Sequence, residues 1–246
     1  MNQALALDNI SYSMSGVEIL KTLKLDVAKS QYYAIAGING AGKSTLIKLI
    51  LDLIRPAPGG NISIFGIDNR DRLCREQLAY LPEKFDVKRN VSGSQYLEFI
   101  AAVYRQPVAQ KEIDALCERL DFPPERLTTR VASYSKGMVQ KLGLVSCFML
   151  KRPLIILDEP LSGLDPRARY HFKQLMQDER SSETTILYST HMLADAEDLC
   201  DQFGILHDHE MRFQGTPADC LQQYQADTLE QAYMKCISAS PGGQGS

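Results

Sequence analysis

Nine residues near the start of the chain carry the pattern of a phosphate-binding loop. The stretch GINGAGKST, residues 37–45, fits G-x-x-x-x-G-K-[ST] and stands between a strand-like apolar run and a helical pattern. Glycines let consecutive backbone N–H groups turn toward a phosphate, and the helix N-terminus adds positive potential. In such a loop Lys43 reaches the outer phosphates, and the Ser44 hydroxyl can ligate Mg²⁺. We therefore expect a phosphate-bearing ligand to be bound by Asn39, Gly40, Ala41, Gly42, Lys43, Ser44 and Thr45.

Two carboxylates follow the apolar run LIIL at residues 154–157. Such a run predicts a buried strand, and open α/β sheets bind their ligands at the carboxyl ends of strands. Asp158 is suited to holding Mg²⁺ through water, and Glu159 to polarising or orienting an attacking water. Without the phosphate loop, an ordinary acidic cap after a strand would be the better interpretation.

A histidine also follows a strand pattern. His191 comes directly after TILYST, and an imidazole at that edge can donate to a γ-phosphate oxygen. On its own, such a histidine would more often be structural. His207 and His209 are close enough in sequence to suggest a metal site, but the stretch HDHE is typical of a hairpin tip.

The elements around these residues predict an α/β fold of the P-loop NTPase type, with a mixed sheet and an antiparallel β subdomain. Strand patterns over residues 1–36 give way to strand and helix alternation, which consecutive helical patterns interrupt from about residue 91 to 150. We expect a single domain over residues 1–237. Its parts are an α/β core with the β subdomain (1–90 and 151–220), a helical subdomain (91–150), a C-terminal helix (221–237) and, after the domain, a disordered tail (238–246).

Composition narrows the classes of function. Lys and Arg number 27 against 30 Asp and Glu, a formal net charge of -3, so no broad positive field favours nucleic acid. The six cysteines include no C-x-x-C pair and are expected to be reduced core thiols. We find no signal-peptide pattern and no apolar run near the ~18 residues that span a bilayer. The chain is expected to be cytoplasmic, without direct membrane insertion.

The order of further motifs distinguishes among P-loop proteins. A guanine-reading N/T-K-x-D segment, which small GTPases require, is absent from the sequence. From Leu5 to about Pro217 the chain resembles the ATP-binding subunit of an ABC transporter. The matching stretches are, in order, GINGAGKST, LAYLPEKF, YSKGMVQKLGL, LIILDEP, SGLDP and STHMLADAEDLCD.

The resemblance implies roles for residues that pattern alone leaves open. Ser135 and Gly137 match the signature L-S-G-G-Q, which contacts the γ-phosphate of ATP bound on the P-loop of the other protomer. Asp165 matches the D-loop at the dimer seam, and it can cap the helix that follows. His191 matches the switch histidine, and Glu83 stands where a Q-loop glutamine is usual, which implies that its carboxylate is a Mg²⁺ ligand.

Four positions depart from the usual family pattern. The signature has Lys136 and Met138 in place of glycine and glutamine, and this change, like Glu83, resembles type-2 ABC exporters. Lys136 can face either the opposite ATP or solvent. Met14 stands where an aromatic ring usually stacks on adenine, with Tyr12 as the alternative base contact. ATP is preferred over GTP by resemblance alone.

The function implied is an ATPase subunit that closes as a head-to-tail homodimer over two ATP·Mg²⁺, with Glu159, His191 and Lys43 acting in hydrolysis. Closure would power separately encoded integral membrane permease subunits at the inner face of the cell membrane, with export as the expected direction. Two alternatives remain open. One is a soluble ABC-type switch protein that acts on ribosomes, DNA or another assembly rather than on a membrane complex, and the other is a nucleotide-binding regulatory subunit with little turnover. The cargo is not encoded in these motifs.

Overall fold

The computed structural model describes residues 2–180 and 183–238. The chain divides into two compact units, one formed by Met1–Cys74 with Thr185–Ser246 and the other by Arg75–Thr184. Among the helices of the described residues, none combines the length and the apolar character needed to cross a bilayer. The tail expected over 238–246 lies, from residue 239 onward, outside the described residues.

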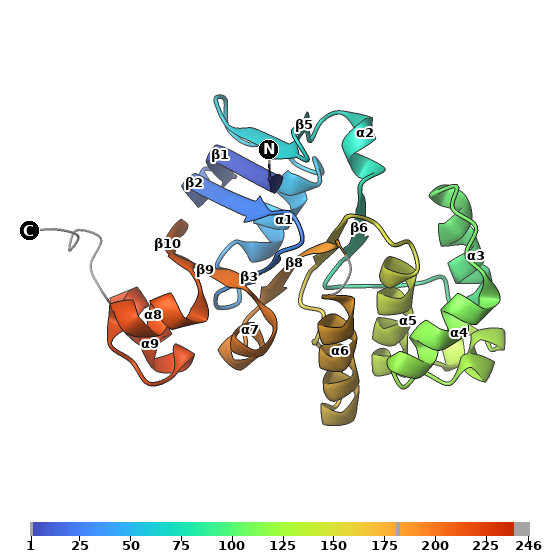
Figure 1. The fold of residues 1–246 in the computed structure, drawn as a ribbon. Coiled ribbons are helices and arrows are strands. Elements are labelled where there is room, and N and C mark those ends of the chain that lie inside the picture. Colours follow the sequence, from blue (N-terminus) through green and yellow to red (C-terminus); the bar gives the residue numbers. More distant parts are fainter. Residues whose placement is uncertain (1, 181–182, 239–246) are drawn as a thin grey trace, which may run out of the picture. The chain divides into compact units, whose positions relative to one another are not determined.

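Two sets of paired strands form the first unit (Figure 1). One is an antiparallel sheet in the order β2-β1-β4-β5. In the other set, β3 lies between β8 and β9 and is parallel to both, while β10 is antiparallel to β9. The elements are β1 (Gln3–Met14), β2 (Val17–Ala28), β3 (Tyr32–Ala36), α1 (Lys43–Ile50), β4 (Asn61–Ile64), β5 (Ile67–Asp68), β8 (Thr185–Thr190), α7 (Leu193–Leu199), β9 (Gln202–His207), β10 (Glu210–Gly215), α8 (Pro217–Tyr224) and α9 (Leu229–Ser238).

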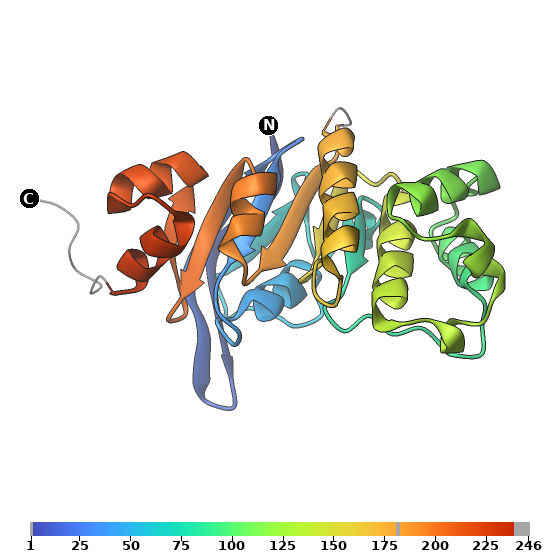
Figure 2. The same cartoon turned by 90° about the horizontal axis from the view of Figure 1, so that it is seen from below.

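The burial of β2 and of β3 follows the sequence pattern of each strand. All five residues of β3 are buried, as expected for a parallel strand covered on both faces. Along β2, buried and exposed residues mostly alternate, as expected for an antiparallel strand with one solvated face. Helix α7 contacts β3 and β8, and Figure 2 shows it alongside these strands. Because β3 and β8 are parallel neighbours, their carboxyl ends lie side by side at one edge of the sheet.

The second unit combines a strand pair with helices. Strands β6 and β7 are parallel, and helices α3, α4 and α5 lie together, as Figure 2 shows. Its elements are β6 (Leu78–Leu81), α3 (Gly93–Val103), α4 (Gln110–Arg119), η1 (Pro124–Thr128), η2 (Val131–Ser133), α5 (Lys136–Phe148), β7 (Leu154–Leu157) and α6 (Pro166–Glu179), while α2 (Arg72–Arg75) bridges the division between the units.

The fold class expected from sequence is confirmed: an α/β chain with an antiparallel sheet and a set of strands that includes parallel pairs. The hairpin predicted around HDHE is β9 and β10. Two helices, α8 and α9, occupy the region predicted as a C-terminal helix over 221–237. All six cysteines lie within the described residues, are buried and form no disulfide. The predicted domain boundaries stay predictions.

Candidate nucleotide-binding and catalytic site

The phosphate loop connects β3 to α1 in the first unit. Gly40 and Gly42 have φ of 86° and 105°, in the left-handed region that glycine adopts readily. Lys43 is only 6% exposed, and its Nζ donates to the carbonyl oxygens of Gly37 and Ile38 at 2.7 and 3.2 Å. These hydrogen bonds hold the lysine ammonium against the first two residues of the loop, while Asn39 and Gly40 are exposed.

Neighbouring strands crowd the space at two of the loop glycines. A Cβ at Gly42 would lie 2.9 Å from Leu20 Cδ2, and one at Gly37 would lie 2.6 Å from the Leu206 carbonyl oxygen. Leu20 and Leu206 were not among the residues predicted from sequence, because their contact with the loop depends on how distant strands pack. Ser44 and Thr45 follow in the first turn of α1 and are half-buried.

His191 lies next to the start of this loop along the sheet edge. The backbone N–H of Gly37 donates to the Thr190 carbonyl at 3.2 Å, and Ala36 and Thr190 are partners in the β3–β8 register. His191 follows Thr190 directly and is exposed. Strand pairing thus brings the predicted switch histidine and the phosphate loop to one edge of the sheet.

The predicted base contact lies on the β1–β2 hairpin. Met14 ends β1, pairs with Val17 and is 59% exposed. Tyr12 is half-buried and pairs with Leu20, whose side chain borders Gly42 of the loop. Both Met14 and Tyr12 thus belong to the hairpin that flanks the loop, and the choice between them stays a prediction.

The two carboxylates predicted after strand β7 belong to the second unit. Asp158 is 2% exposed and Glu159 is 8% exposed. The Asp158 N–H donates to the Leu81 carbonyl at 2.8 Å, which fixes the strand end against β6. Glu159 has φ of 51°, a left-handed conformation that is rare for a residue with a β-carbon. Such backbone strain concentrates at functional sites.

Glu83 shares an environment with Asp158 around the phenol of Tyr80. Burial, with a smaller contribution from the charges of Asp158 and Glu83, raises the pKa of Tyr80 to about 12. Glu83 itself is exposed. The charges of Asp158 and Glu83 therefore both affect the Tyr80 phenol. Two carboxylates around one group are the kind of oxygen ligands that a divalent cation takes. Tyr80 was missed from sequence, although it stands three residues before Glu83 in LAYLPEK.

The signature residues begin helix α5. Ser135 is the N-cap, and its Oγ accepts a hydrogen bond from the Met138 N–H at 3.2 Å. The Tyr134 ring packs edge-on against Phe122, and its hydroxyl donates to the Arg126 carbonyl at 2.6 Å. Ser135 is exposed at the start of the 13-residue helix α5. The backbone N–H donors of the first turn and the positive end of the helix dipole therefore lie at the same end of α5 as the Ser135 hydroxyl.

The signature packs against the D-loop within the second unit. A Cβ at Gly163, where φ is 78°, would lie 3.0 Å from Lys136 Cε, so the aliphatic part of Lys136 covers this glycine. A Cβ at Gly137 would lie 3.4 Å from the Gly163 carbonyl oxygen. Asp165 caps α6 as predicted, since its Oδ1 accepts from the Ala168 N–H at 2.8 Å.

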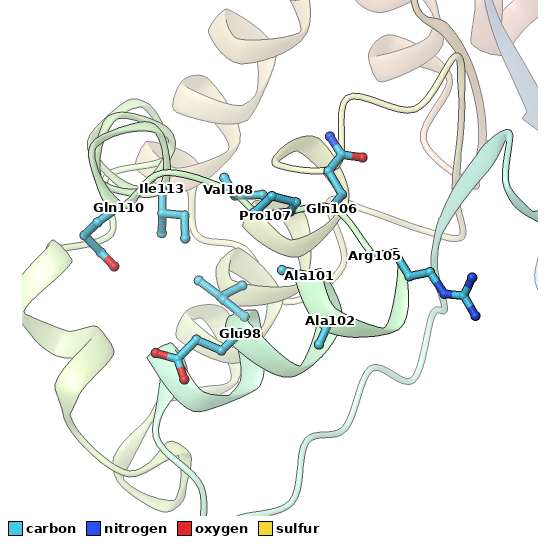
Figure 3. Close-up of a pocket in the computed structure, with 10 residues that line it drawn as sticks. Glu98, Ala101, Ala102, Arg105, Gln106, Pro107, Val108, Gln110 and Ile113 are labelled. Atoms are coloured by element: carbon cyan, nitrogen blue, oxygen red, sulfur yellow. The ribbon is translucent and has the colours of Figure 1, made fainter.

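A cavity of about 520 Å³ opens elsewhere in the second unit, between α3 and α4 (Figure 3). Its lining is mainly apolar, with Ile113 of α4 pointing toward α3 and the Arg105 guanidinium pointing away from the hollow. None of the predicted phosphate-binding or catalytic residues lines it. The candidate chemistry thus belongs to the strand ends and the α5 N-terminus rather than to this cavity.

Comparison with known proteins agrees with these features. The ABC transporter family matches residues 20–162, more than half of the chain. The chain is 32% identical to EcsA, an ABC-type transporter ATP-binding protein of Bacillus subtilis, over 91% of this chain and 92% of EcsA. It is 34% identical to a solved ATP-binding subunit of an ABC transporter, with a TM-score of 0.87 covering 95% of this chain and 99% of that one.

Some relatives are considerably longer than this chain. An uncharacterised ABC transporter ATP-binding protein of Synechocystis is 32% identical over 83% of this chain but only 58% of its own length. The chain thus spans less than two thirds of that relative. The ATP-binding domains of the ABC transporter family are ATPases with the P-loop NTPase fold. Together with the loop, the strand-end carboxylates and the capped signature helix, the matches show that this chain belongs to that family, as an ATP-binding subunit of the type-2 exporter group.

Proposed function

We propose that this protein binds and hydrolyses ATP to power transport by a membrane permease. The observation that carries the proposal is the phosphate loop, in which two left-handed glycines and the buried Lys43 surround an exposed loop surface. Its backbone donors, the α1 N-terminus and the Lys43 ammonium form an anion site suited to a triphosphate. Residues 39–45 would hold the phosphates, with Met14 or Tyr12 against the base.

The donor set fits Mg²⁺. Hard cations take oxygen ligands, and Ser44, Asp158 and Glu83 supply a hydroxyl and two carboxylates. When bound, Mg²⁺ neutralises charge on the β- and γ-phosphate oxygens. The joint effect of Asp158 and Glu83 on the pKa of Tyr80 supports the assignment of both carboxylates to one acidic environment.

Three side chains have proposed roles in hydrolysis. Glu159 orients the attacking water and accepts its proton, a role in which the carboxylate must be held within hydrogen-bond reach of the nucleophile. His191 donates to a γ-phosphate oxygen. Lys43 reaches the outer phosphates and stabilises the charge that spreads over them.

The second half of each site is proposed to come from another copy of the chain. Ser135 is exposed and Gly137 is half-buried, at the start of a helix whose N-terminus suits an anion. In a head-to-tail homodimer they would contact ATP held by the partner's phosphate loop, with Asp165 at the seam. ATP binding closes this dimer, and hydrolysis opens it.

The permease is proposed to be a separate integral membrane protein that receives the motion near residues 83–96. The likeness of Glu83 and of the Lys136–Met138 signature to type-2 exporters supports export as the direction. The chain would then act in the cytoplasm, attached to the inner face of the membrane through the permease. A permease that co-purifies with this chain supports this part of the proposal.

The catalytic assignment is tested by Glu159→Gln. We expect ATP hydrolysis to fall by about hundredfold or more, because the variant keeps the side-chain shape but loses the base. The variant should also accumulate as an ATP-bound dimer in size-exclusion chromatography.

A matched carboxylate-to-amide control in the same unit is Glu179→Gln, at the end of α6, where Glu179 pairs with Arg119 at 2.8 Å. It should hydrolyse ATP at the parental rate. Undiminished hydrolysis in Glu159→Gln would mean that another group acts as the base.

A further inference from the structure

A buried glutamine of the signature helix contacts the segment that carries Glu159. Gln140 is 6% exposed, and its Nε2 donates to the Pro160 carbonyl oxygen at 3.0 Å. Pro160 is buried as well. A buried carbonyl needs a hydrogen-bond partner, and losing one costs the desolvation of that group. The position of Pro160 is therefore tied to the position of α5.

The Pro160 carbonyl belongs to the residue directly after Glu159, where the backbone is strained. Glu159 has φ of 51°, and the turn continues with a hydrogen bond from the Ser162 N–H to the Glu159 carbonyl at 3.0 Å. A non-glycine residue in this conformation persists only when its surroundings hold it. The Asp158 N–H fixes the near side of Glu159 through Leu81. Gln140 fixes the far side.

The same helix contacts this segment at its functional end. Lys136 covers Gly163, and Gly137 approaches the Gly163 carbonyl. Gln140 lies five residues after Ser135, roughly 7 to 8 Å along the helix axis at 1.5 Å per residue. A short rigid helix thus has the exposed signature at one end and a hydrogen bond to the Glu159 segment about one turn further on.

We infer that Gln140 is a positioning residue that links the signature helix to the catalytic carboxylate of the same chain. The inference rests on the proposed function, in which the signature contacts ATP held by the partner while Glu159 serves the chain's own ATP. When the signature binds ATP, the position of α5 becomes fixed. The hydrogen bond from Gln140 then fixes the position of the Pro160 backbone beside Glu159. Occupation of one site of the dimer therefore aligns the base of the other.

The test is Gln140→Met in the full-length chain, because methionine has a similar volume and length but no donor. We expect kcat to fall about ten- to hundredfold, since a misplacement of about 1 Å can cost that much. The KM for ATP should stay within about twofold, because the phosphate loop is untouched. The Hill coefficient of hydrolysis against ATP concentration should fall toward unity.

The matched control is Ser146→Ala in the same helix. Ser146 is 5% exposed, and its Oγ donates to the Gly143 carbonyl at 2.7 Å within α5, so this variant removes a buried hydrogen bond without reaching residue 160. It should keep kcat and the Hill coefficient. Gln140→Asn, which keeps the amide but is one methylene too short, should behave as Gln140→Met does, and it serves if the methionine variant does not fold.

A double variant separates this inference from the proposed function. If Gln140 acts through Glu159, then Gln140→Met with Glu159→Gln is no slower than Glu159→Gln alone. A parental kcat in Gln140→Met, or losses that multiply in the double variant, would overturn the inference. If Glu159→Gln alone leaves hydrolysis unchanged, the catalytic assignment fails instead.

Discussion

At the scale of single residues, the phosphate loop depends on backbone conformations that few side chains tolerate. Gly42 has φ of 105°, and a Cβ there would also meet Leu20 Cδ2 at 2.9 Å. Gly16 has a similar conformation, with φ of 79°, but open space around it. The two glycines thus separate backbone strain from steric exclusion, because a substitution at Gly16 brings only the strain.

We expect Gly42→Ala to abolish measurable ATP binding and to lower the free energy of unfolding by about 1–3 kcal/mol through strain and contact. Gly16→Ala should lower stability by about 1 kcal/mol and leave ATP binding intact. Urea unfolding and calorimetric titration with ATP measure the two quantities. Equal loss of binding in both variants would show that the loop does not need the space at Gly42.

The structure shows where the stem of Lys136 lies, although the sequence left open whether this residue faces the opposite ATP or solvent. Its aliphatic stem lies on Gly163, so the residue is placed by packing as well as by charge. Whether its ammonium reaches an ATP on the partner chain stays a prediction. A long side chain at this position has a structural reason, because a glycine there would uncover the left-handed Gly163.

At the scale of elements, Asp121 joins three helices of the second unit. Asp121 follows α4 and accepts hydrogen bonds from Lys141 of α5. The Lys141 Nζ lies 2.6 Å from the carbonyl oxygen of Asp121 and 3.4 Å from its Oδ2. Its Oδ1 accepts from Arg167 of α6 at 2.7 Å. Burial acts to raise the pKa of Asp121, but the charges of Lys141 and Arg167 and their hydrogen bonds together hold that pKa below its ordinary value.

Because this pKa is lowered on folding, the ionised Asp121 stabilises the fold above the ordinary carboxyl pKa of about 4, and the contribution is lost as the pH falls through the lowered value. Asp121→Asn should therefore reduce the free energy of unfolding at about pH 7 by roughly 1 kcal/mol. The difference from the parent should shrink as the pH falls below about 4, measured by urea unfolding at each pH.

A control for this prediction is Glu112→Gln, which breaks an exposed ion pair with Lys151 at 3.2 Å. Its cost at neutral pH should be smaller, because both of its side chains are well exposed to solvent. A loss in Asp121→Asn that is the same at every pH would point to packing rather than to charge.

Some elements begin, end or divide for local reasons that the sequence pattern does not show. The apolar pattern of α1 continues through residues 51–54, but the helix ends at Ile50, because Asp52 adopts a φ of 54° and the Leu53 N–H turns back to the Lys48 carbonyl. Strand β6 has only four residues, which is too short a run for alternation to identify. At Gln225 the left-handed C-cap separates α8 from α9.

The site shows a different limit of sequence reading. The phosphate loop and the Asp158–Glu159 pair follow from short patterns because each is one strand end with its adjoining turn. Gln140 and Leu20 do not, since their partners Pro160 and Gly42 are 20 or more residues away in the sequence. A polar residue on the buried face of α5 was the available signal for Gln140.

At the scale of the whole molecule, the proposed dimer makes each site a product of two chains. A C₂ dimer repeats one surface on both copies, so the signature of each chain serves the phosphate loop of the other. Defects placed in the loop half and in the signature half should then complement each other in a mixture. Defects placed in the same half should not.

We expect that mixing Glu159→Gln with Gly137→Asp restores hydrolysis although each variant alone is inactive. In the mixed dimer one site contains both defects, and the other combines an intact Glu159 with an intact signature. Random exchange makes half of the dimers mixed, so independent sites would give about a quarter of the parental rate per chain. If Gln140 links the signature to Glu159 within one chain, the rate should fall below that quarter, because the intact Glu159 belongs to the chain with Gly137→Asp. Mixing Glu159→Gln with Lys43→Ala is the matched control. Each site of that mixed dimer keeps one loop-side defect, so it should stay inactive. Equal rates in the two mixtures would show that each chain completes its own site, and the head-to-tail arrangement would have to be abandoned.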